Sequence, residues 1–477
     1  MTTRSRWLAL YVLCLGVLMI VLDTTIVTVA LPSIKADLGF SETGLVWVVN
    51  AYMLTFGGLL LLGGRLGDLY GQRRLFLLGL TLFTLASLAC GMAGTQVLLV
   101  TARAVQGVGG AVITAVALSL ITNLFTEPDE RAKAMGVYGF VCAAGGSIGA
   151  LLGGVLTETL SWRSIFLVNL PIGIVVYLLS RRLLPADDSA DAAHHRLDVA
   201  GAVTVTSALM LAVYAVVNGN QLGWLSAQTL GLLGLAALLL GLFLWIESRV
   251  AQPLMPLGLF RLRNLATANA IGVLWSAGMF AWFFLSALYL QLVLGYGPLE
   301  VGLAFVPADL IMAAFSLGLS AWIVMRYGQR GPVWLGLVLG TLGLLLFARA
   351  PLAGNFWIDV LPGMLLLGLG AGLAFNPLLL AAMGDVEEKD SGLASGIVNT
   401  SFMLGGALGL AVLASFADAR SAGLRAAGVE AVSALHQGYL LAFLIGAGFT
   451  TLAALLGALL LRPKSASETA DLTQPTG

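Results

Sequence analysis

The chain has 477 residues, of which 59% are hydrophobic and 10% are charged, against about 25% charged residues in an average soluble domain. So few charges cannot cover a water-facing surface, and the composition therefore excludes a soluble globular protein. The 24 basic and 24 acidic residues give a net charge of zero, which favours neither nucleic acid nor an acidic partner. Cys14, Cys90 and Cys142 all fall in apolar segments, which predicts packing residues rather than disulfides or a metal site.

Apolar segments of about 20 residues recur along the whole chain, and each could cross about 30 Å of hydrocarbon as a helix. They are apolar on every face and rich in Gly, whereas a spanning β-barrel shows alternating segments of about ten residues. We therefore predict an all-α polytopic membrane protein. The predicted spans, in chain order, are 7–31, 44–64, 75–94, 97–121, 134–157, 165–184, 199–218, 229–247, 265–294, 299–325, 332–349, 359–383, 391–415 and 438–461.

The basic residues concentrate on one side of these fourteen spans. With the N-terminus inside, 18 of the 24 Lys and Arg residues fall in predicted cytoplasmic segments, five fall in outer segments, and Arg103 falls within a span. The outer five are Lys35, Arg163, Arg349, Arg420 and Arg425. This asymmetry predicts a multi-pass protein of the cell (inner) membrane with both termini in the cytoplasm.

An internal repeat divides the chain into two related parts. Residues 70–73 and residues 327–330 both read YGQR, and glycine patterns in spans 97–121 and 359–383 recur at nearly the same offset. Both parts begin on the same side of the membrane, so we expect them to be related by an axis along the membrane normal. The predicted organisation is an N-terminal six-helix half (1–184), a cytoplasmic linker (185–198), an inserted two-helix hairpin (199–247), a second linker (248–264), a C-terminal six-helix half (265–461) and a cytoplasmic tail (462–477).

Asp23 and Arg103 are ionisable residues inside predicted spans, where a charge costs about 2.5 to 3.5 kcal/mol. If Pro32 ends the first span, Asp23 lies about 13 Å below the outer surface, and Arg103 lies about 9 Å below it. Their similar depths allow the two side chains to pair. A pair of this kind that opens and closes would change the proton affinity of the carboxylate, as proton-coupled transport requires. The structural alternative is a static ion pair that orders the helix bundle.

Asp309 is a third ionisable residue within a span, two residues after the helix-kinking Pro307. The repeat offset makes Tyr52 its equivalent in the first half. We expect a substrate cavity lined by Asp309, Tyr52, Asn50 and Gln106. Asp309 would there carry a proton or attract a cationic substrate, and the alternative is a carboxyl group hydrogen-bonded in a helix interface.

A short predicted cytoplasmic turn, GRLGDLYGQRR at 64–74, combines charges with glycines. Asp68 is suited to cap a neighbouring helix N-terminus, and the arginines are suited to bridge to carboxylates. We predict a conformational latch formed by Gly64, Asp68, Gly71, Arg73 and Arg74. A basic loop that only sets membrane topology is the alternative.

The fifth predicted span carries Gly145, Gly149, Gly153 and Gly154 at helical spacing. One face of this helix therefore presents almost no side chains, so another backbone can approach closely. We expect either a sliding interface between the halves or generic helix packing.

Together these features resemble the major facilitator superfamily, in particular its fourteen-helix drug:proton antiporter branch, over nearly the whole chain. LDTTIVTVALP at 22–32 is similar to the first-span motif of that branch, with Asp23 as its acid. GRLGDLYGQRR matches the loop motif of the superfamily, in which Asp68 and Arg73 are the key positions. The stretch 99–110 resembles the motif of the fourth span, and the resemblance implies a role for Arg103 in proton transfer.

Two further segments carry the resemblance. The four glycines of the fifth span match the antiporter motif, although Ala150 occupies the usual proline position. WRSIFLVNLPIG at 162–173 is similar to a segment typical of the branch, with Ser164 where an aromatic residue is common.

The resemblance implies alternating access, in which a drug or small amphipathic compound leaves the cytoplasm or inner leaflet in exchange for protons. The transporter would be driven by the proton gradient without a cofactor or metal, and would work as a monomer. The alternative transporter is a dedicated exporter of one metabolite or self-made antibiotic. No nucleotide-binding P-loop and no nucleophile with a base occur in the sequence, which argues against an ATP-driven pump and against an enzyme.

Overall fold

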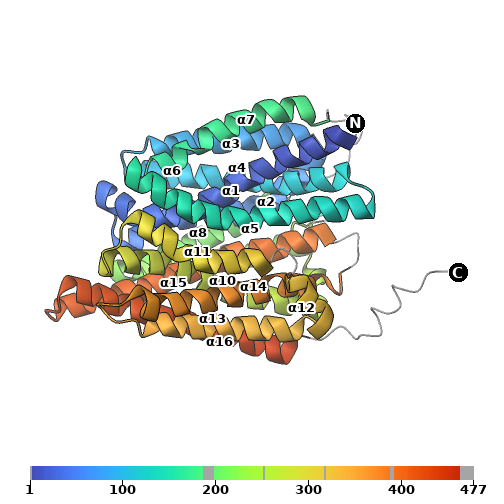
Figure 1. Cartoon of the computed structure of the whole chain (residues 1–477). Helices are drawn as coiled ribbons and strands as arrows, with labels where there is room; N and C mark the ends of the chain where they lie inside the picture. The colour runs from blue at the N-terminus through green and yellow to red at the C-terminus, as the bar shows by residue number, and fades with distance from the viewer. Residues whose placement is uncertain (1–2, 186–197, 251–252, 316–318, 387–390, 462–477) are drawn as a thin grey trace.

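The computed structural model describes residues 3–185, 198–250, 253–315, 319–386 and 391–461, and the regular structure in these residues is entirely helical. The helices lie side by side along one common direction (Figure 1). The α-helices are α1 (Thr3–Leu38), α2 (Glu42–Tyr70), α3 (Gln72–Gly91), α4 (Gln96–Leu124), α5 (Pro128–Thr159), α6 (Ser164–Leu167), α7 (Asn169–Leu183), α8 (Val199–Leu222), α9 (Ala227–Arg249), α10 (Arg263–Leu288), α11 (Pro298–Ala314), α12 (Ser320–Tyr327), α13 (Arg330–Ala348), α14 (Leu361–Met383), α15 (Ser391–Ala426) and α16 (Ala431–Leu460). A 3₁₀ turn η1 (Leu257–Arg261) precedes α10, and the π-helical turns η2 (Tyr289–Val293) and η4 (Phe356–Val360) adjoin α10 and α14.

Twelve helical segments in the described residues are long and apolar enough to cross a membrane. Helix α5 and the pair α11 and α12 lie where the other two spans, 134–157 and 299–325, were predicted. The largest boundary difference is at α15, which continues to Ala426 instead of ending near 415. An all-helical membrane protein is therefore confirmed.

Pro32 does not end the first helix, contrary to the prediction. It lies inside α1, which continues for more than a turn to Leu38. Proline costs a soluble helix an intrahelical hydrogen bond, but in a membrane bundle the neighbouring helices compensate for the lost bond. Asp23 therefore lies about 22 Å along the helix axis from the end of α1 at Leu38.

The same helix pairings occur twice in the bundle. Helix α1 packs on α5 as α10 packs on α15, α2 on α4 as α11 on α14, and α3 on α4 as α13 on α14. The YGQR turns also match, because Gly71 and Gly328 both adopt a positive φ, of 93° and 70°, that favours glycine. Between the two sets, the main contacts are α2 with α15 and α5 with α11. The α8–α9 hairpin lies against α2 and α15 through α8.

Candidate functional site

Asp23, in α1, forms a buried ion pair with Arg103, in α4. Asp23 is 0% exposed and Arg103 is 1% exposed. The Arg103 Nη1 donates to Asp23 Oδ2 at 2.5 Å, and the Arg103 Nε donates to the Val48 carbonyl of α2 at 2.9 Å. The predicted pairing of these two residues is thus present in the structure, and the guanidinium is also tied to α2.

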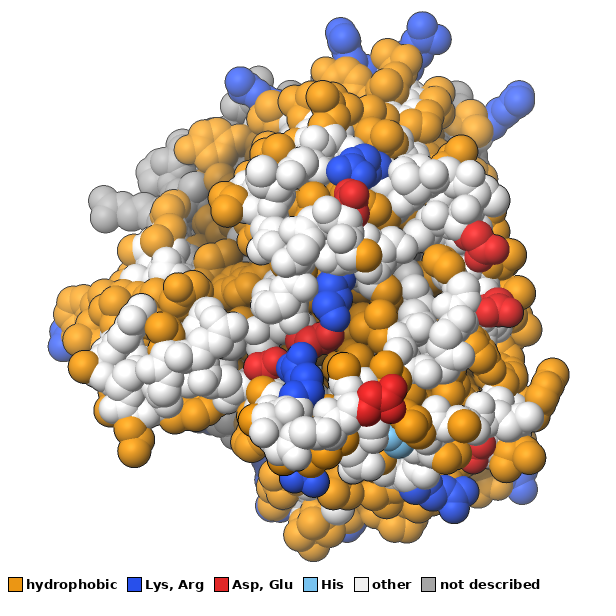
Figure 2. Space-filling model, turned by 90° about the vertical axis from the view of Figure 1, so that its left-hand side faces the viewer, with side chains coloured by type: hydrophobic (Ala, Val, Ile, Leu, Met, Phe, Trp, Pro, Cys, Tyr) orange, Lys and Arg blue, Asp and Glu red, His pale blue; other side chains and the backbone are white. Residues whose placement is uncertain are grey.

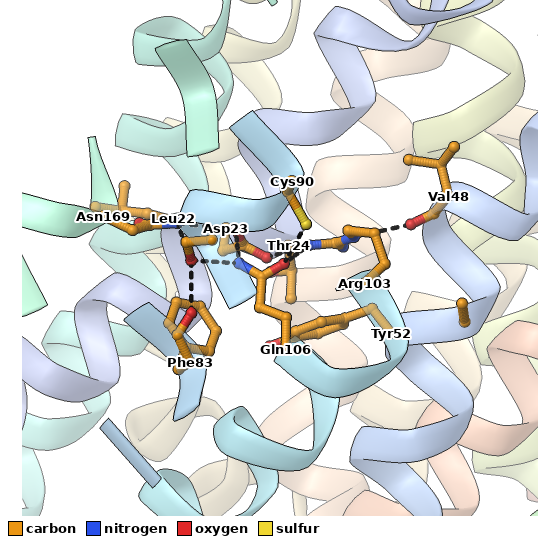
Figure 3. A network of polar contacts seen from close by, with 12 residues as sticks. Leu22, Asp23, Thr24, Val48, Tyr52, Phe83, Cys90, Arg103, Gln106 and Asn169 are labelled. Atoms are coloured by element: carbon orange, nitrogen blue, oxygen red, sulfur yellow. Dashed lines mark hydrogen bonds and ion pairs between the residues drawn. The ribbon is translucent and has the colours of Figure 1, made fainter. Parts of the chain in front are cut away.

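Amide and hydroxyl side chains complete the surroundings of the carboxylate (Figure 3). The Gln106 Nε2 donates to Asp23 Oδ1 at 2.7 Å, and the Asn169 Nδ2 donates to the same oxygen at 3.0 Å. Both amides also donate to Ser87 Oγ, at 2.8 and 3.4 Å. The Ser87 hydroxyl in turn donates to the Phe83 carbonyl. Asp23 therefore accepts three hydrogen bonds from α4 and α7, and Ser87 of α3 closes the ring.

Tyr52 lies against the other side of Arg103. The guanidinium carbon is 4.4 Å from the centre of the Tyr52 ring, within range of a cation–π contact. Gly107 allows α2 and α4 to approach closely here, because a β-carbon at Gly107 would lie 2.1 Å from Thr55 Oγ1 and 2.4 Å from the Tyr52 carbonyl oxygen. Tyr52 is 1% exposed and its hydroxyl has no hydrogen-bond partner among the described residues.

This arrangement has a definite electrostatic consequence. A carboxylate and a guanidinium buried together are stable as a pair, whereas removing one partner leaves an uncompensated charge at a cost of about 3 to 5 kcal/mol. If α4 moved relative to α1, the carboxylate would lose its only charged partner among the described residues. In this geometry the charged partner of the Asp23 carboxylate therefore depends on the position of α4.

Of the four residues predicted to line one cavity, Gln106 and Tyr52 both contact Arg103, whereas Asn50 and Asp309 lie in other surroundings, and the cavity itself stays a prediction. Gln106 belongs to the Asp23 network and Tyr52 packs on Arg103. The Asn50 Nδ2 donates at 2.9 Å to the Ala407 carbonyl of α15, so Asn50 joins α2 to the second set of helices. Asp309, in α11, is 5% exposed, and its Oδ2 has no partner among the described residues. These helices are apolar all round, so their hydrophobic pattern does not reveal which face a residue occupies.

The predicted latch is only partly visible. Arg73, at the start of α3, donates to the Arg181 carbonyl near the end of α7. Arg74 also has an interaction partner, and Gly64 leaves room for α4, where Ala115 Cβ would lie 3.7 Å from an added β-carbon. The side chain of Asp68 lies outside the described residues. The role of the segment as a latch therefore stays a prediction.

The glycines of α5 do not form one face between the two sets of helices. Added β-carbons at Gly145, Gly149 and Gly153 would meet Val21, Thr25 and Ile26 of α1. These three glycines therefore allow α5 and α1 of the first set to approach closely. An added β-carbon at Gly154 would lie 2.7 Å from the Pro298 carbonyl of α11, so Gly154 alone of the four contacts the other set.

The end of the bundle predicted to face outside is joined by three contacts between the two sets of helices. The Leu299 N–H at the start of α11 donates to Glu158 Oε2 at 2.9 Å. The Gln291 Nε2 donates to the Val29 carbonyl at 2.8 Å. The Tyr439 hydroxyl donates to Glu42, which also pairs with Lys35. Figure 2 looks onto this end, where basic and acidic side chains meet near the centre of the face.

The sequence did not single out Ser87 and Asn169 as members of the Asp23 network. Asn169 lies in the segment WRSIFLVNLPIG, and both residues are uncharged polar groups inside apolar helices. Such groups commonly form hydrogen bonds between membrane helices, so their positions alone did not distinguish them from packing residues.

The comparison with protein families decides the class of protein. The Major Facilitator Superfamily model matches residues 13–410. The chain belongs to this superfamily. Its members are transporters, which agrees with the prediction of a membrane transporter rather than an enzyme.

The chain is also similar to curated proteins along most of its length. It is 40% identical over 423 residues to the cephamycin export protein CmcT of Amycolatopsis lactamdurans, covering 88% of this chain and 87% of the relative. It is 38% identical over 474 residues to the puromycin resistance protein pur8 of Streptomyces alboniger, covering 98% and 93%. It is 38% identical over 412 residues to the multidrug resistance protein Stp of Mycobacterium tuberculosis strain CDC 1551, covering 86% and 76%.

Among solved structures, the fold resembles that of a bacterial homologue of the human lysosomal transporter Spinster, crystallised in an inward-facing and occupied conformation. The TM-score is 0.70 at 16% sequence identity, and the match covers 97% of this chain and 98% of the other. At this identity the likeness concerns the fold alone.

Proposed function

We propose that this transporter is a proton-coupled antiporter that exports drugs or small amphipathic and cationic compounds from the cytoplasm or inner leaflet. Relatives named for cephamycin export, puromycin resistance and multidrug resistance support the export of such compounds. The observation that carries proton coupling is the buried Asp23–Arg103 pair with its ring of amides. No cofactor is needed in this mechanism.

In the proposed cycle, Asp23 is the proton carrier. With Arg103 in contact, the carboxylate stays ionised. When α4 shifts and takes Arg103 away, Asp23 binds a proton, and it releases the proton when the pair forms again. One charge that moves down 100 mV supplies about 2.3 kcal/mol, which sustains a gradient of about fifty-fold for a neutral substrate.

We propose that the chain crosses the membrane fourteen times, as in the drug:proton antiporter branch. The twelve candidate spans together with α5 and the α11–α12 pair support this number, and the repeated helix pairings support two six-helix halves with the α8–α9 hairpin inserted between them. Both termini are cytoplasmic in this proposal because of the basic residues, and the transporter works as a monomer. Contacts such as that of Glu158 with α11 then close the outer end.

Asp309 is the proposed site of cation recognition or of a second proton. Its carboxyl group is buried in α11, which packs on α5 across the boundary of the halves, and its Oδ2 has no partner among the described residues. A buried carboxyl group without a partner is costly, so an exchangeable partner such as a proton or a cationic substrate fits this position.

The second candidate function is the dedicated export of one metabolite or self-made antibiotic. The names of two relatives, the cephamycin export protein and a probable actinorhodin transporter of Streptomyces coelicolor, favour it. Both functions use the same fold and the same coupling residues, so only substrate breadth separates them.

Efflux assays separate these functions. Cells that express the chain are loaded with dyes, quaternary ammonium compounds and antibiotics, with and without an uncoupler. The proposal expects uncoupler-sensitive efflux of several chemically different compounds. Efflux of a single compound favours the dedicated exporter, and efflux that persists after the proton gradient collapses contradicts proton coupling.

A further inference from the structure

Two carboxyl groups lie together at the base of the α8–α9 hairpin, away from the Asp23 network. Asp198 caps the N-terminus of α8, where its Oδ1 accepts from the Gly201 N–H at 2.7 Å. Glu247 lies near the end of α9, and its Oε2 accepts from the Met255 N–H of the following linker at 2.9 Å. Both acids are only 3% exposed.

The remaining oxygen of each acid is turned toward the other. A β-carbon added at Gly201 would lie 2.4 Å from Asp198 Oδ2 and 2.9 Å from Glu247 Oε1, so both oxygens border the same small space. Both are buried, and neither accepts a hydrogen bond from a donor in the described part of the chain. Two ionised carboxylates this close and this buried repel each other, and carboxyl pairs in such surroundings share one proton.

We propose that Asp198 and Glu247 form a proton-binding site in which one shared proton bridges Asp198 Oδ2 and Glu247 Oε1. One acid donates and the other accepts, while the outer oxygen of each keeps its backbone N–H. This satisfies all four oxygens of the pair. The site is separate from the coupling site at Asp23, and the inference does not depend on which compound the transporter exports.

The pair fastens the linker between α9 and α10 to the first half of the bundle. Met255 is held by Glu247, and the preceding Leu254 packs with Leu62 of α2 and Ala202 of α8. The Pro253 carbonyl accepts from Arg65 of α2. Because α2 also packs on α15, the pair lies where the hairpin meets a helix that contacts both halves. Loss of the shared proton would place two like charges here and release the linker from Glu247.

Other charged groups at this end of the hairpin belong to the elements packed around it. Within the described residues they are Arg65 of α2, Arg249 of α9, and Arg261 and Arg263 at the linker's far end. Arg249 lies over the Trp245 ring, 6.0 Å from its centre, and Arg263 donates to the Leu460 carbonyl. Asp198 Oδ2 and Glu247 Oε1 remain without a hydrogen-bond partner in the described part of the chain, and a proton shared between them supplies one.

The test uses the purified full-length transporter and two readouts that need no transport. Infrared difference spectra of wild type against Glu247→Gln, and of wild type against Asp198→Asn, should each show the loss of one protonated carboxyl band. Each amide can donate the hydrogen bond that the shared proton supplied, so both variants should fold. Hydrogen–deuterium exchange at 253–262, corrected for the intrinsic effect of pH, reports whether the linker is held.

In wild type, protection of the linker should fall as pH is raised, by about tenfold for each pH unit over the range in which the folded pair still holds its proton and the separated acids do not, and should level off once the pair has released it. The sign follows because the folded pair binds a proton that the separated acids do not, so its stabilisation is present at low pH and is lost at high pH. Protection in Glu247→Gln and Asp198→Asn should not depend on pH. The control Asp37→Asn, an acid that pairs with Arg163 at the other end of the bundle, should behave as wild type.

Two results would overturn the proposal. Wild-type protection that does not change with pH, together with no loss of a protonated band in either variant, would mean that no proton is shared. Protection that disappears with a chelator and returns on adding Ca²⁺ or Mg²⁺ would mean that a metal ion holds the pair. The wild-type titration alone decides the matter if either variant fails to fold.

Discussion

Replacing Asn169 by Leu should change the pH dependence of transport while leaving the ion pair in place. The substitution keeps a similar side-chain size and removes one of the three donors to Asp23, leaving Arg103 Nη1 and Gln106 Nε2. A hydrogen bond to a charged group contributes about 1.5 to 3 kcal/mol, which corresponds to about one to two pH units. The lost donor stabilises only the ionised carboxylate, so the pH midpoint of transport should move upward by that amount.

The assay measures substrate uptake into inverted vesicles over a series of pH values at constant membrane potential. Asn218→Leu is the matched control, because Asn218 lies in α8 and its Nδ2 donates to the Tyr214 carbonyl of its own helix. The control should keep the wild-type midpoint. An Asn169→Leu transporter that folds and inserts normally but keeps the wild-type midpoint would refute the account of the Asp23 network.

Two more substitutions test the packing and the outer end. Gly107→Ala places a methyl group against Thr55 Oγ1 and the α2 backbone, and this overpacking should lower the free energy of unfolding by about 1 to 3 kcal/mol. The control Gly448→Ala, which has nothing within 4 Å of the added methyl group, should not lower it. Equal melting temperatures of the two variants would contradict the close α2–α4 contact. Glu158→Ala removes the carboxylate of α5 that caps the N-terminus of α11, which should weaken the contact between the outer ends of these two helices by about 0.5 to 2 kcal/mol. Spin labels on the outer ends of α5 and α11 should then report longer distances. Glu300→Ala, which removes a cap inside α11 itself, is the control and should leave those distances unchanged.

The sequence predicted the features that depend on the length of the apolar segments and on the cost of placing a charge inside a membrane span. Helix positions followed from apolar segments, and Asp23 and Arg103 were recognisable because a charge inside a span needs a partner. The predicted end of the first helix was wrong because the surrounding bundle tolerates Pro32 within α1.

Helix orientation about its own axis could not be predicted in the same way. The sequence did not show that Tyr52 packs on Arg103, that Asn50 donates a hydrogen bond to α15, or that Asp309 is buried in α11. The acid pair of Asp198 and Glu247 joins residues 49 positions apart in a part of the chain without a repeat equivalent. Only the packing of α8 against α9 brings these two carboxyl groups together.

The central claim is that Asp23 carries the coupled proton, and the Asp23→Asn variant tests it most directly. Asparagine keeps the size of the side chain but can neither ionise nor bind a proton. In sealed vesicles, an imposed pH gradient should drive substrate transport by wild type and by the control Asp37→Asn, but not by Asp23→Asn, although that variant should still insert. Transport by Asp23→Asn at the wild-type rate under the same pH gradient would contradict the role of Asp23 as the proton carrier.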